Sequence, residues 1–131
     1  MKLDSSLFDH LSAQARTNER LRISHDLRTT TADSSQRILN ALEPGTIVPI
    51  HRHRQTSETV IVIRGCMKEF FYNDFGELVE EFLLKEGTSC VALQIPAGQW
   101  HTVEVLESGT IIFEGKDGPY SPLTEEDILR V

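Results

Sequence analysis

The sequence has few cysteines, and their spacing does not build a site. Cys66 and Cys90 are the only two in 131 residues, and they do not form a CxxC pair. They therefore provide neither a zinc knuckle nor a disulfide framework. We expect each to lie in a strand as a small apolar residue, and we expect no thiol nucleophile.

Long apolar runs and clustered positive charge are also missing. No stretch approaches the roughly 18 residues that a transmembrane helix needs, and the first ten residues lack the apolar region of a signal peptide. The 13 Lys and Arg are scattered among 20 Asp and Glu, which gives a net charge of −7 and no basic surface for nucleic acid. We therefore expect a cytoplasmic protein that binds neither membranes nor nucleic acid.

The length and the 39% hydrophobic content suit a single domain, 1–131, with a buried core. We divide it into an N-terminal helix and irregular arm (1–36), a β-barrel (37–115) and a C-terminal tail (116–131). In SSLFDHLSAQAR, apolar residues recur every fourth position after a Ser cap, which predicts one amphipathic helix. The polar stretch 20–36 predicts irregular chain with one short strand at most.

From residue 37 onward, short segments rich in Val, Ile and Phe are separated by Gly, Pro, Asn or Asp, which is the pattern of short β-strands. The seven predicted segments are 37–44, 59–65, 66–73, 77–84, 89–96, 99–106 and 110–115. So many short strands in one stretch predict an all-β sandwich or barrel. The turn signals at 73–77 and 106–110 predict hairpins between neighbouring strands.

Two histidines one residue apart precede one of these strands. Side chains two apart on a strand share a face, so His51 and His53 can converge while Arg52 points away. Residues 54–57 allow a tight reversal, after which Glu58 opens the next strand beside the pair. Two imidazoles and a carboxylate on adjacent strands suit a divalent first-row metal ion.

A fourth ligand is expected downstream, at His101 in PAGQWH. Pro96 and Gly98 predict a turn before a strand whose inward residues would include Gln99, His101 and Val103. The prediction is one divalent first-row transition metal, Zn, Fe, Ni or Mn, held by His51, His53, Glu58 and His101.

These residues resemble the conserved motifs of the cupin superfamily. Gly45, His51-x-His53, Glu58 and Gly65 match the spacing of the first cupin motif position for position. PAGQWH is similar to the core of the second motif, Pro-x-Gly-x-x-His. The resemblance implies the cupin double-stranded β-helix, a jelly-roll-like barrel, here with a short N-terminal helix.

The second motif departs from the superfamily pattern in two places. The glycine expected before the proline would fall at Cys90, and the asparagine expected after the last histidine would fall at Val105. The first departure indicates a longer turn between the motifs. The second removes a polar group from the neighbourhood of the pocket.

Over nearly its whole length, the chain resembles the WbuC family of small cupin-fold metalloproteins. The matching features are the N-terminal helix followed by RLRISHDLR, the strand QRILNALEPGTIVPIHRH and the closing EGKDGPYSP. Members resemble products of bacterial surface-polysaccharide clusters. The resemblance therefore implies a ligand related to a sugar or a nucleotide sugar.

Two functions are compatible with such a centre. Three neutral imidazoles and one carboxylate leave a divalent ion with a net charge of about +1, which favours a small anionic or hydroxylated ligand. The first hypothesis is a metal-dependent enzyme whose reaction and catalytic residues the sequence does not identify. The alternative is a non-catalytic binding module that the metal supports, because one fold hosts many functions.

The positively charged arm and the closing loop each have two interpretations. His25 with Arg20, Arg22 and Arg28 is either a lid that closes on an anionic group or a solvated charged segment, and we favour the solvated segment. The residues of GKDGPYSP (115–122) are most simply a surface loop rather than the rim of a pocket.

The strand TVIVIR predicts an apolar outer face. If Glu58 points inward, Val60 and Val62 follow it, and Ile61 and Ile63 point outward, where they need cover. A homodimer would supply this cover, and so would the N-terminal helix.

Overall fold

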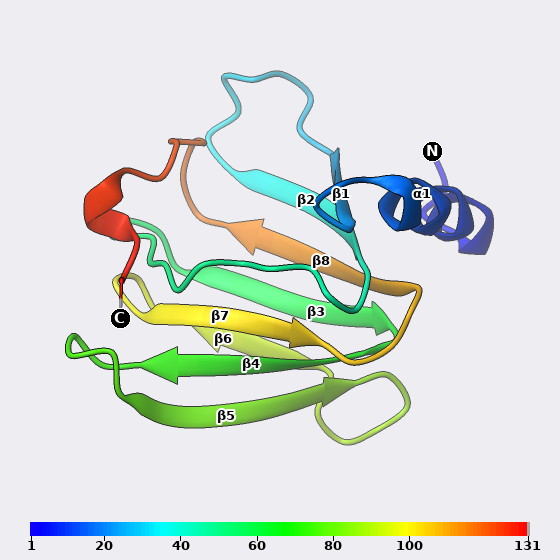
Figure 1. The fold of residues 1–131 in the computed structure, drawn as a ribbon. Coiled ribbons are helices and arrows are strands. Elements are labelled where there is room, and N and C mark those ends of the chain that lie inside the picture. Colours follow the sequence, from blue (N-terminus) through cyan, green and yellow to red (C-terminus); the bar gives the residue numbers. More distant parts are fainter. Residues whose placement is uncertain (131) are drawn as a thin grey trace.

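The computed structural model describes residues 1–130, which form one α-helix and eight strands in two antiparallel sheets (Figure 1). The elements are α1 (Ser5–Thr17), β1 (Arg22–Asp26), β2 (Gln36–Leu42), β3 (Glu58–Arg64), β4 (Cys66–Tyr72), β5 (Leu78–Lys85), β6 (Ala92–Ile95), β7 (Trp100–Val105), β8 (Thr110–Lys116) and a 3-10 turn at Glu125–Asp127. One sheet has the order β1-β2-β8-β3-β6 and the other β5-β4-β7. The predicted all-β class with an N-terminal helix is confirmed. No helix among these residues is long and apolar enough to cross a membrane.

The main core lies between the two sheets because alternate residues of each strand are apolar. In β3, Val60 and Val62 are 2% and 3% exposed, whereas Ile61 between them is 37% exposed. The cluster comprises Leu42, Val60, Val62, Met67, Leu84, Ile95, Val105 and Ile112. Each side chain of this size stabilises the fold by about 1.5–3 kcal/mol when it is fully buried. The predicted inward direction of Val60 and Val62 is confirmed.

A second apolar cluster lies between α1 and the outer face of the five-stranded sheet. Helix residues Phe8, Leu11 and Ala15, spaced three and four apart, share one side of α1. They pack against outward residues of β2 and β8, including Leu39, and Ile63 of β3 packs at the edge of this cluster. The helix therefore covers Ile63, one of the two residues for which we expected cover.

The N-cap of α1 lies before the predicted Ser cap. Asp4 is the N-cap, and its carboxylate accepts a hydrogen bond of 3.1 Å from the backbone N–H of Leu7. A carboxylate at this position satisfies one of the free N–H groups of the first turn and interacts favourably with the helix dipole.

One predicted hairpin is confirmed and the other is wrong. The turn at 73–77 joins β4 to β5, which pair antiparallel. The turn at 106–110 joins β7 of the three-stranded sheet to β8 of the five-stranded sheet, so it crosses between the layers. A turn signal specifies a local reversal of the chain, but it does not specify which sheet the next strand enters.

The two cysteines differ in environment. Cys66 is buried at the start of β4, as expected, whereas Cys90 is exposed in the loop before β6. The expectation for Cys90 is wrong because β6 is only four residues long and begins at Ala92. The loop is instead organised by Thr88, whose hydroxyl donates to the carbonyl oxygen of Lys85 at 2.7 Å.

Candidate metal centre

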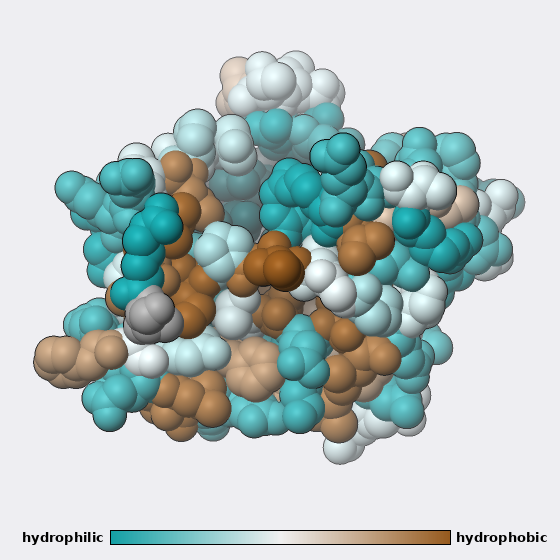
Figure 2. Space-filling view, viewed as in Figure 1, coloured by the Kyte–Doolittle hydropathy of each residue, from teal (hydrophilic) through white to brown (hydrophobic). Residues whose placement is uncertain are grey.

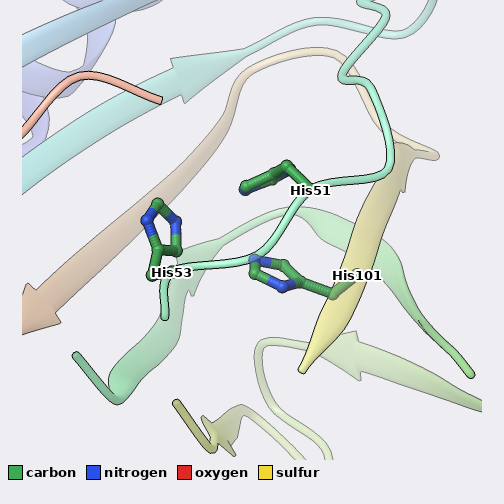
Figure 3. Close-up of side chains that lie close together, drawn as sticks. All are labelled: His51, His53 and His101. Carbon is green, nitrogen blue, oxygen red and sulfur yellow. The ribbon is translucent and has the colours of Figure 1, made fainter. Parts of the chain in front are cut away.

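Three imidazole rings meet between the sheets. His51 and His53 lie on the segment between β2 and β3, and His101 lies on β7 (Figure 3). One ring nitrogen of each lies within 4.8 Å of those of the other two. His51 is not in a regular strand as predicted, but its backbone pairs with that of His101 through N–H···O bonds of 3.0 and 2.8 Å. This pairing keeps the chain extended, so His51 and His53 still turn toward one centre.

The backbone fixes the orientation of two of the rings. Nδ1 of His51 lies 2.8 Å from the carbonyl oxygen of Pro49, and Nδ1 of His101 lies 2.9 Å from that of Gln99. Because a carbonyl oxygen only accepts hydrogen bonds, both Nδ1 atoms must carry the hydrogen. The lone pair is then on Nε2, where a metal ion would bind.

Glu58 completes the group of predicted ligands. Its Oε2 lies 3.5 Å from Nε2 of His53 and 3.6 Å from Nε2 of His101. The residue is only 5% exposed, and Oε2 has no hydrogen-bond partner among the described residues. A buried oxygen of this kind is costly unless it is satisfied, and a cation among these donors would satisfy it. The donor set therefore fits a divalent metal ion, and coordination by Glu58 stays a prediction.

Burial keeps the imidazoles in the state that can bind a metal. It lowers the pKa of His51 to about 4 and that of His53 to about 3, and it also lowers the pKa of His101. The Lys116 ammonium nearby contributes to the lowering in all three. The rings are therefore neutral near pH 7, as coordination requires.

The centre lies in a cavity of about 800 Å³, and the space-filling view shows this face of the molecule hollowed above its centre (Figure 2). Val103 lines the cavity together with His101, as predicted. Gln99 does not line it, because its amide donates to the backbone carbonyl oxygens of Tyr72 and Trp100 within the turn.

The arm and the tail both reach this cavity. Arg20 and Arg22 line it, whereas His25 and Arg28 are not among its lining residues. Arg28 instead forms a salt bridge of 2.7 Å with Asp26. The loop at 117–124 also lines the cavity, so our interpretation of this loop as a plain surface segment is wrong.

Sequence reasoning did not identify two acids in the cavity wall, the buried Glu69 on β4 and the partly buried Glu114 on β8. The amide of Asn40 donates to Glu114 at 2.9 Å. Burial raises the pKa of Glu114 to about 8, and the negative charge of Glu58 beside it contributes. The available signal was an acidic residue at an inward position of an otherwise apolar strand, in CMKEFFY and TIIFEGK.

A family described as a domain of unknown function, DUF6016, matches residues 3–84, which are more than half of the chain. The chain belongs to this family. The matched part of the DUF6016 protein includes His51, His53 and Glu58, whereas His101 lies beyond it. No curated protein matched the sequence.

Solved structures show the fold of the DUF6016 protein. KdgF from Halomonas sp. is 14% identical with a TM-score of 0.61, over 80% of this chain and 85% of KdgF. The capsular polysaccharide assembling protein CapF from Staphylococcus aureus is 20% identical with a TM-score of 0.66, over 81% of this chain but only 28% of CapF. The Schizosaccharomyces pombe Cnp3 cupin domain is 9% identical with a TM-score of 0.60, over 76% of this chain and 66% of that domain. The predicted cupin jelly roll is confirmed, and membership of the WbuC family stays a prediction.

Proposed function

We propose that this DUF6016 protein is a metal-dependent enzyme that acts on a small anionic molecule related to a sugar or a nucleotide sugar. The observation that carries the proposal is the convergence of three neutral imidazoles and Glu58 in one cavity. Its volume of about 800 Å³ falls within the range of pockets that bind small molecules.

The metal would be Zn, Fe, Ni or Mn, because imidazole nitrogen and carboxylate oxygen suit all four. A bound ion of this kind polarises a carbonyl oxygen or lowers the pKa of a water molecule. His51 and His101 are already oriented for it by their backbone hydrogen bonds. Little free energy is therefore needed to orient these two ligands when the ion binds.

Two unpaired arginines support an anionic ligand. Arg20 and Arg22 line the cavity, and neither takes part in a salt bridge within residues 1–130. The arginines that do pair with carboxylates are Arg28, Arg37, Arg52, Arg54 and Arg64. Arg22 is held by a bond of 3.0 Å from Nη1 to the carbonyl oxygen of Ile47, which leaves its other donors for a carboxylate or a phosphate group.

Two further observations favour the context of bacterial surface polysaccharides. The resemblance to the WbuC family implies it, and CapF, which shares the fold, is named as a capsular polysaccharide assembling protein. Together they favour a sugar or nucleotide sugar over other small anions as the ligand.

Elemental analysis of protein purified without added metal tests the proposal. We expect about one equivalent of a first-row metal in the wild type and almost none in the double variant His53→Ala/His101→Ala, because two of the four donors are lost. The matched control His10→Ala/His25→Ala removes two histidines outside the cluster and should retain the metal. A chelator should lower the melting temperature of the wild type more than that of the ligand variant. Unchanged metal content in the ligand variant would contradict the proposal.

Cobalt substitution distinguishes the two functional hypotheses, an enzyme and a non-catalytic module. An open coordination position would let an added anion such as azide change the visible absorption spectrum of the cobalt-loaded protein. A spectrum that azide leaves unchanged would indicate a saturated ion and would favour the non-catalytic role.

A further inference from the structure

Glu69 lies in the middle of β4 and points between the sheets. The register pairs Glu69 with Val103 of β7, and the next inward pair along the two strands is Phe71 with His101. Glu69 is therefore one residue pair along the barrel from a predicted metal ligand. Its side chain lines the same cavity as the three imidazoles.

This glutamate has no partner among the residues that the structure describes, 1–130. It is 1% exposed, its Oε2 has no hydrogen-bond partner, and no salt bridge within residues 1–130 involves it. Glu43 provides a comparison, because it is also buried, at 5% exposure. Its carboxylate accepts bonds of 2.6 Å from the hydroxyl of Ser108 and from the backbone N–H of Gly109. Glu43 thus stabilises a turn, whereas Glu69 stabilises nothing in the described structure.

A buried polar group without a partner costs free energy, and an apolar residue of similar size would remove that cost. The fold therefore gains nothing from an acid at position 69. Natural proteins keep such unfavourable groups where a ligand or a reaction needs them.

The protonation state of Glu69 determines what it can bind. Burial raises the pKa of this carboxyl group well above its usual range, and electrostatic interaction with the acidic groups of Glu58 and Glu114 raises it further. The raised pKa favours the protonated form of the group, which has one O–H donor and a carbonyl acceptor. A hydroxyl group of a ligand has the complementary donor and acceptor.

We propose that Glu69 is a substrate-binding residue whose carboxyl group hydrogen-bonds a hydroxyl group of a ligand that carries its anionic group toward Arg20 and Arg22. This assignment rests on the proposed function, because it describes the ligand of the same cavity. It narrows the ligand class to an anion with hydroxyl groups. A purely apolar carboxylate would leave Glu69 unsatisfied, and an uncharged polyol would leave the two arginines unpaired.

The binding test uses zinc-loaded protein and three open-chain six-carbon probes, titrated by calorimetry. D-gluconate has both a carboxylate and hydroxyl groups, sorbitol has hydroxyl groups only, and hexanoate has the carboxylate only. We expect the wild type to bind gluconate most tightly. Glu69→Leu should weaken gluconate binding about ten-fold, and Glu69→Gln, which keeps a donor and an acceptor, should stay within about three-fold of the wild type. Glu43→Leu is the control and should bind gluconate like the wild type.

Thermal unfolding of the same variants supplies a readout that a structural role would not produce. Glu69→Leu should raise the melting temperature by about 3 °C, because it removes an unsatisfied buried group, and Glu43→Leu should lower it. A melting temperature that falls in Glu69→Leu as it does in Glu43→Leu would assign Glu69 to the fold and overturn the proposal.

The failures of the two proposals are distinguishable. If the zinc-loaded wild type binds gluconate and Glu69→Leu binds it equally well, the role of Glu69 is wrong and the metal centre stands. If the zinc-loaded wild type does not prefer gluconate to sorbitol and hexanoate, the hydroxylated anion is wrong as the ligand class. A wild type that retains no zinc would contradict the proposed function itself.

Discussion

At the scale of single residues, the backbone rather than other side chains sets the geometry of the centre. His51 and His101 each donate from Nδ1 to a carbonyl oxygen two residues earlier in the chain. Metal-binding histidines are commonly held through the nitrogen that does not bind the ion. Here that support is local, so it depends on the extended backbone of each segment. The substitution of a distant side chain should therefore leave these two rings in place.

The depressed pKa values predict that metal binding survives mild acid. In the unfolded chain an imidazole has a pKa of about 6.5, whereas burial brings His51 to about 4 and His53 to about 3. The unfolded chain therefore takes up protons first, so these groups contribute full stability above about pH 6.5 and lose it as the pH falls toward 4. In the folded protein, protons therefore compete with the metal for His51 and His53 only at about pH 4 and below. We expect zinc to be retained at pH 5 and released toward pH 4.

Equilibrium dialysis at a fixed free zinc concentration, from pH 7.5 to 3.5, measures this release. The variant His10→Ala/His25→Ala should give the same curve, because neither histidine belongs to the cluster. Release of half of the bound zinc near pH 6.5 would show that the ligands titrate like exposed imidazoles. Full retention at pH 3.5 would contradict the predicted release toward pH 4.

The four metal-binding positions could be predicted from the sequence, and Glu69 could not, for a physical reason. His51, His53, Glu58 and His101 have a spacing that places their side chains on one face of extended chain. Glu69 is one of 20 acidic residues, and the alternation along β4 indicates only that it shares a face with Met67. Its place in the cavity follows from the pairing of β4 with β7, which depends on contacts between residues 28 to 38 positions apart in the sequence.

At the scale of elements, the junction between β3 and β4 depends on Gly65. Its φ of +91° lies in the left-handed region, and a Cβ added there would lie 2.7 Å from Cα of Thr110. The hydroxyl of Thr110 is itself engaged, because it donates to the carbonyl oxygen of Glu107 at 2.8 Å. Neither the backbone nor the hydroxyl of Thr110 can move away from a Cβ at position 65 without breaking contacts between β4 and β8. The last glycine of the stretch that resembles the first cupin motif thus has a structural role.

We expect Gly65→Ala to lower the free energy of unfolding by about 2–4 kcal/mol, since strain and a backbone clash combine. Gly87→Ala is the matched control. Gly87 also has a positive φ, +75°, but nothing lies within 4 Å of an added Cβ, so we expect a loss of only about 1 kcal/mol. Urea denaturation of both variants measures the difference. Equal losses would show that strain alone, and not the contact with Thr110, determines the effect.

The strands and their connections also show which features of the fold the sequence predicts and which it does not. Apolar alternation predicts most of the strands, and turn residues predict the 73–77 hairpin. The residues of the 106–110 connection favour a turn, which predicts a hairpin there. Whether a turn leads to the adjacent strand or to the opposite sheet depends on which apolar faces pack together. That information lies in the whole core rather than in five residues.

At the scale of the whole molecule, the cavity brings together three parts of the chain that lie far apart in the sequence. Arg20 and Arg22 come from the arm, the imidazoles from the barrel and its preceding loop, and residues 117–124 from the tail. The arm reaches the cavity because β1 pairs antiparallel with β2, which places Arg22 opposite Leu42. The tail is held against the segment of His51 and His53 by Arg54, which forms salt bridges with Glu126 and Asp127.

The outer face of the five-stranded sheet is only partly covered, and this predicts assembly. Helix α1 covers Ile63, whereas Ile61 stays 37% exposed. The register places Ile61 between exposed Ala92 on β6 and partly buried Phe113 on β8. Because β6 is an edge strand, this apolar face reaches the limit of the sheet, where a second copy of the chain can pack. We therefore predict a homodimer through the face of Ile61.

Size-exclusion chromatography with light scattering, over a range of concentrations, measures the assembly. Ile61→Asp should convert the dimer to a monomer, because a carboxylate would be buried without a partner at the interface. Leu83→Asp is the control: Leu83 is 52% exposed on β5 of the other sheet, and its substitution should leave the dimer intact. A monomeric wild type would show that α1 is the only cover the sheet requires. A dimer that Leu83→Asp disrupts and Ile61→Asp does not would place the interface on the three-stranded sheet.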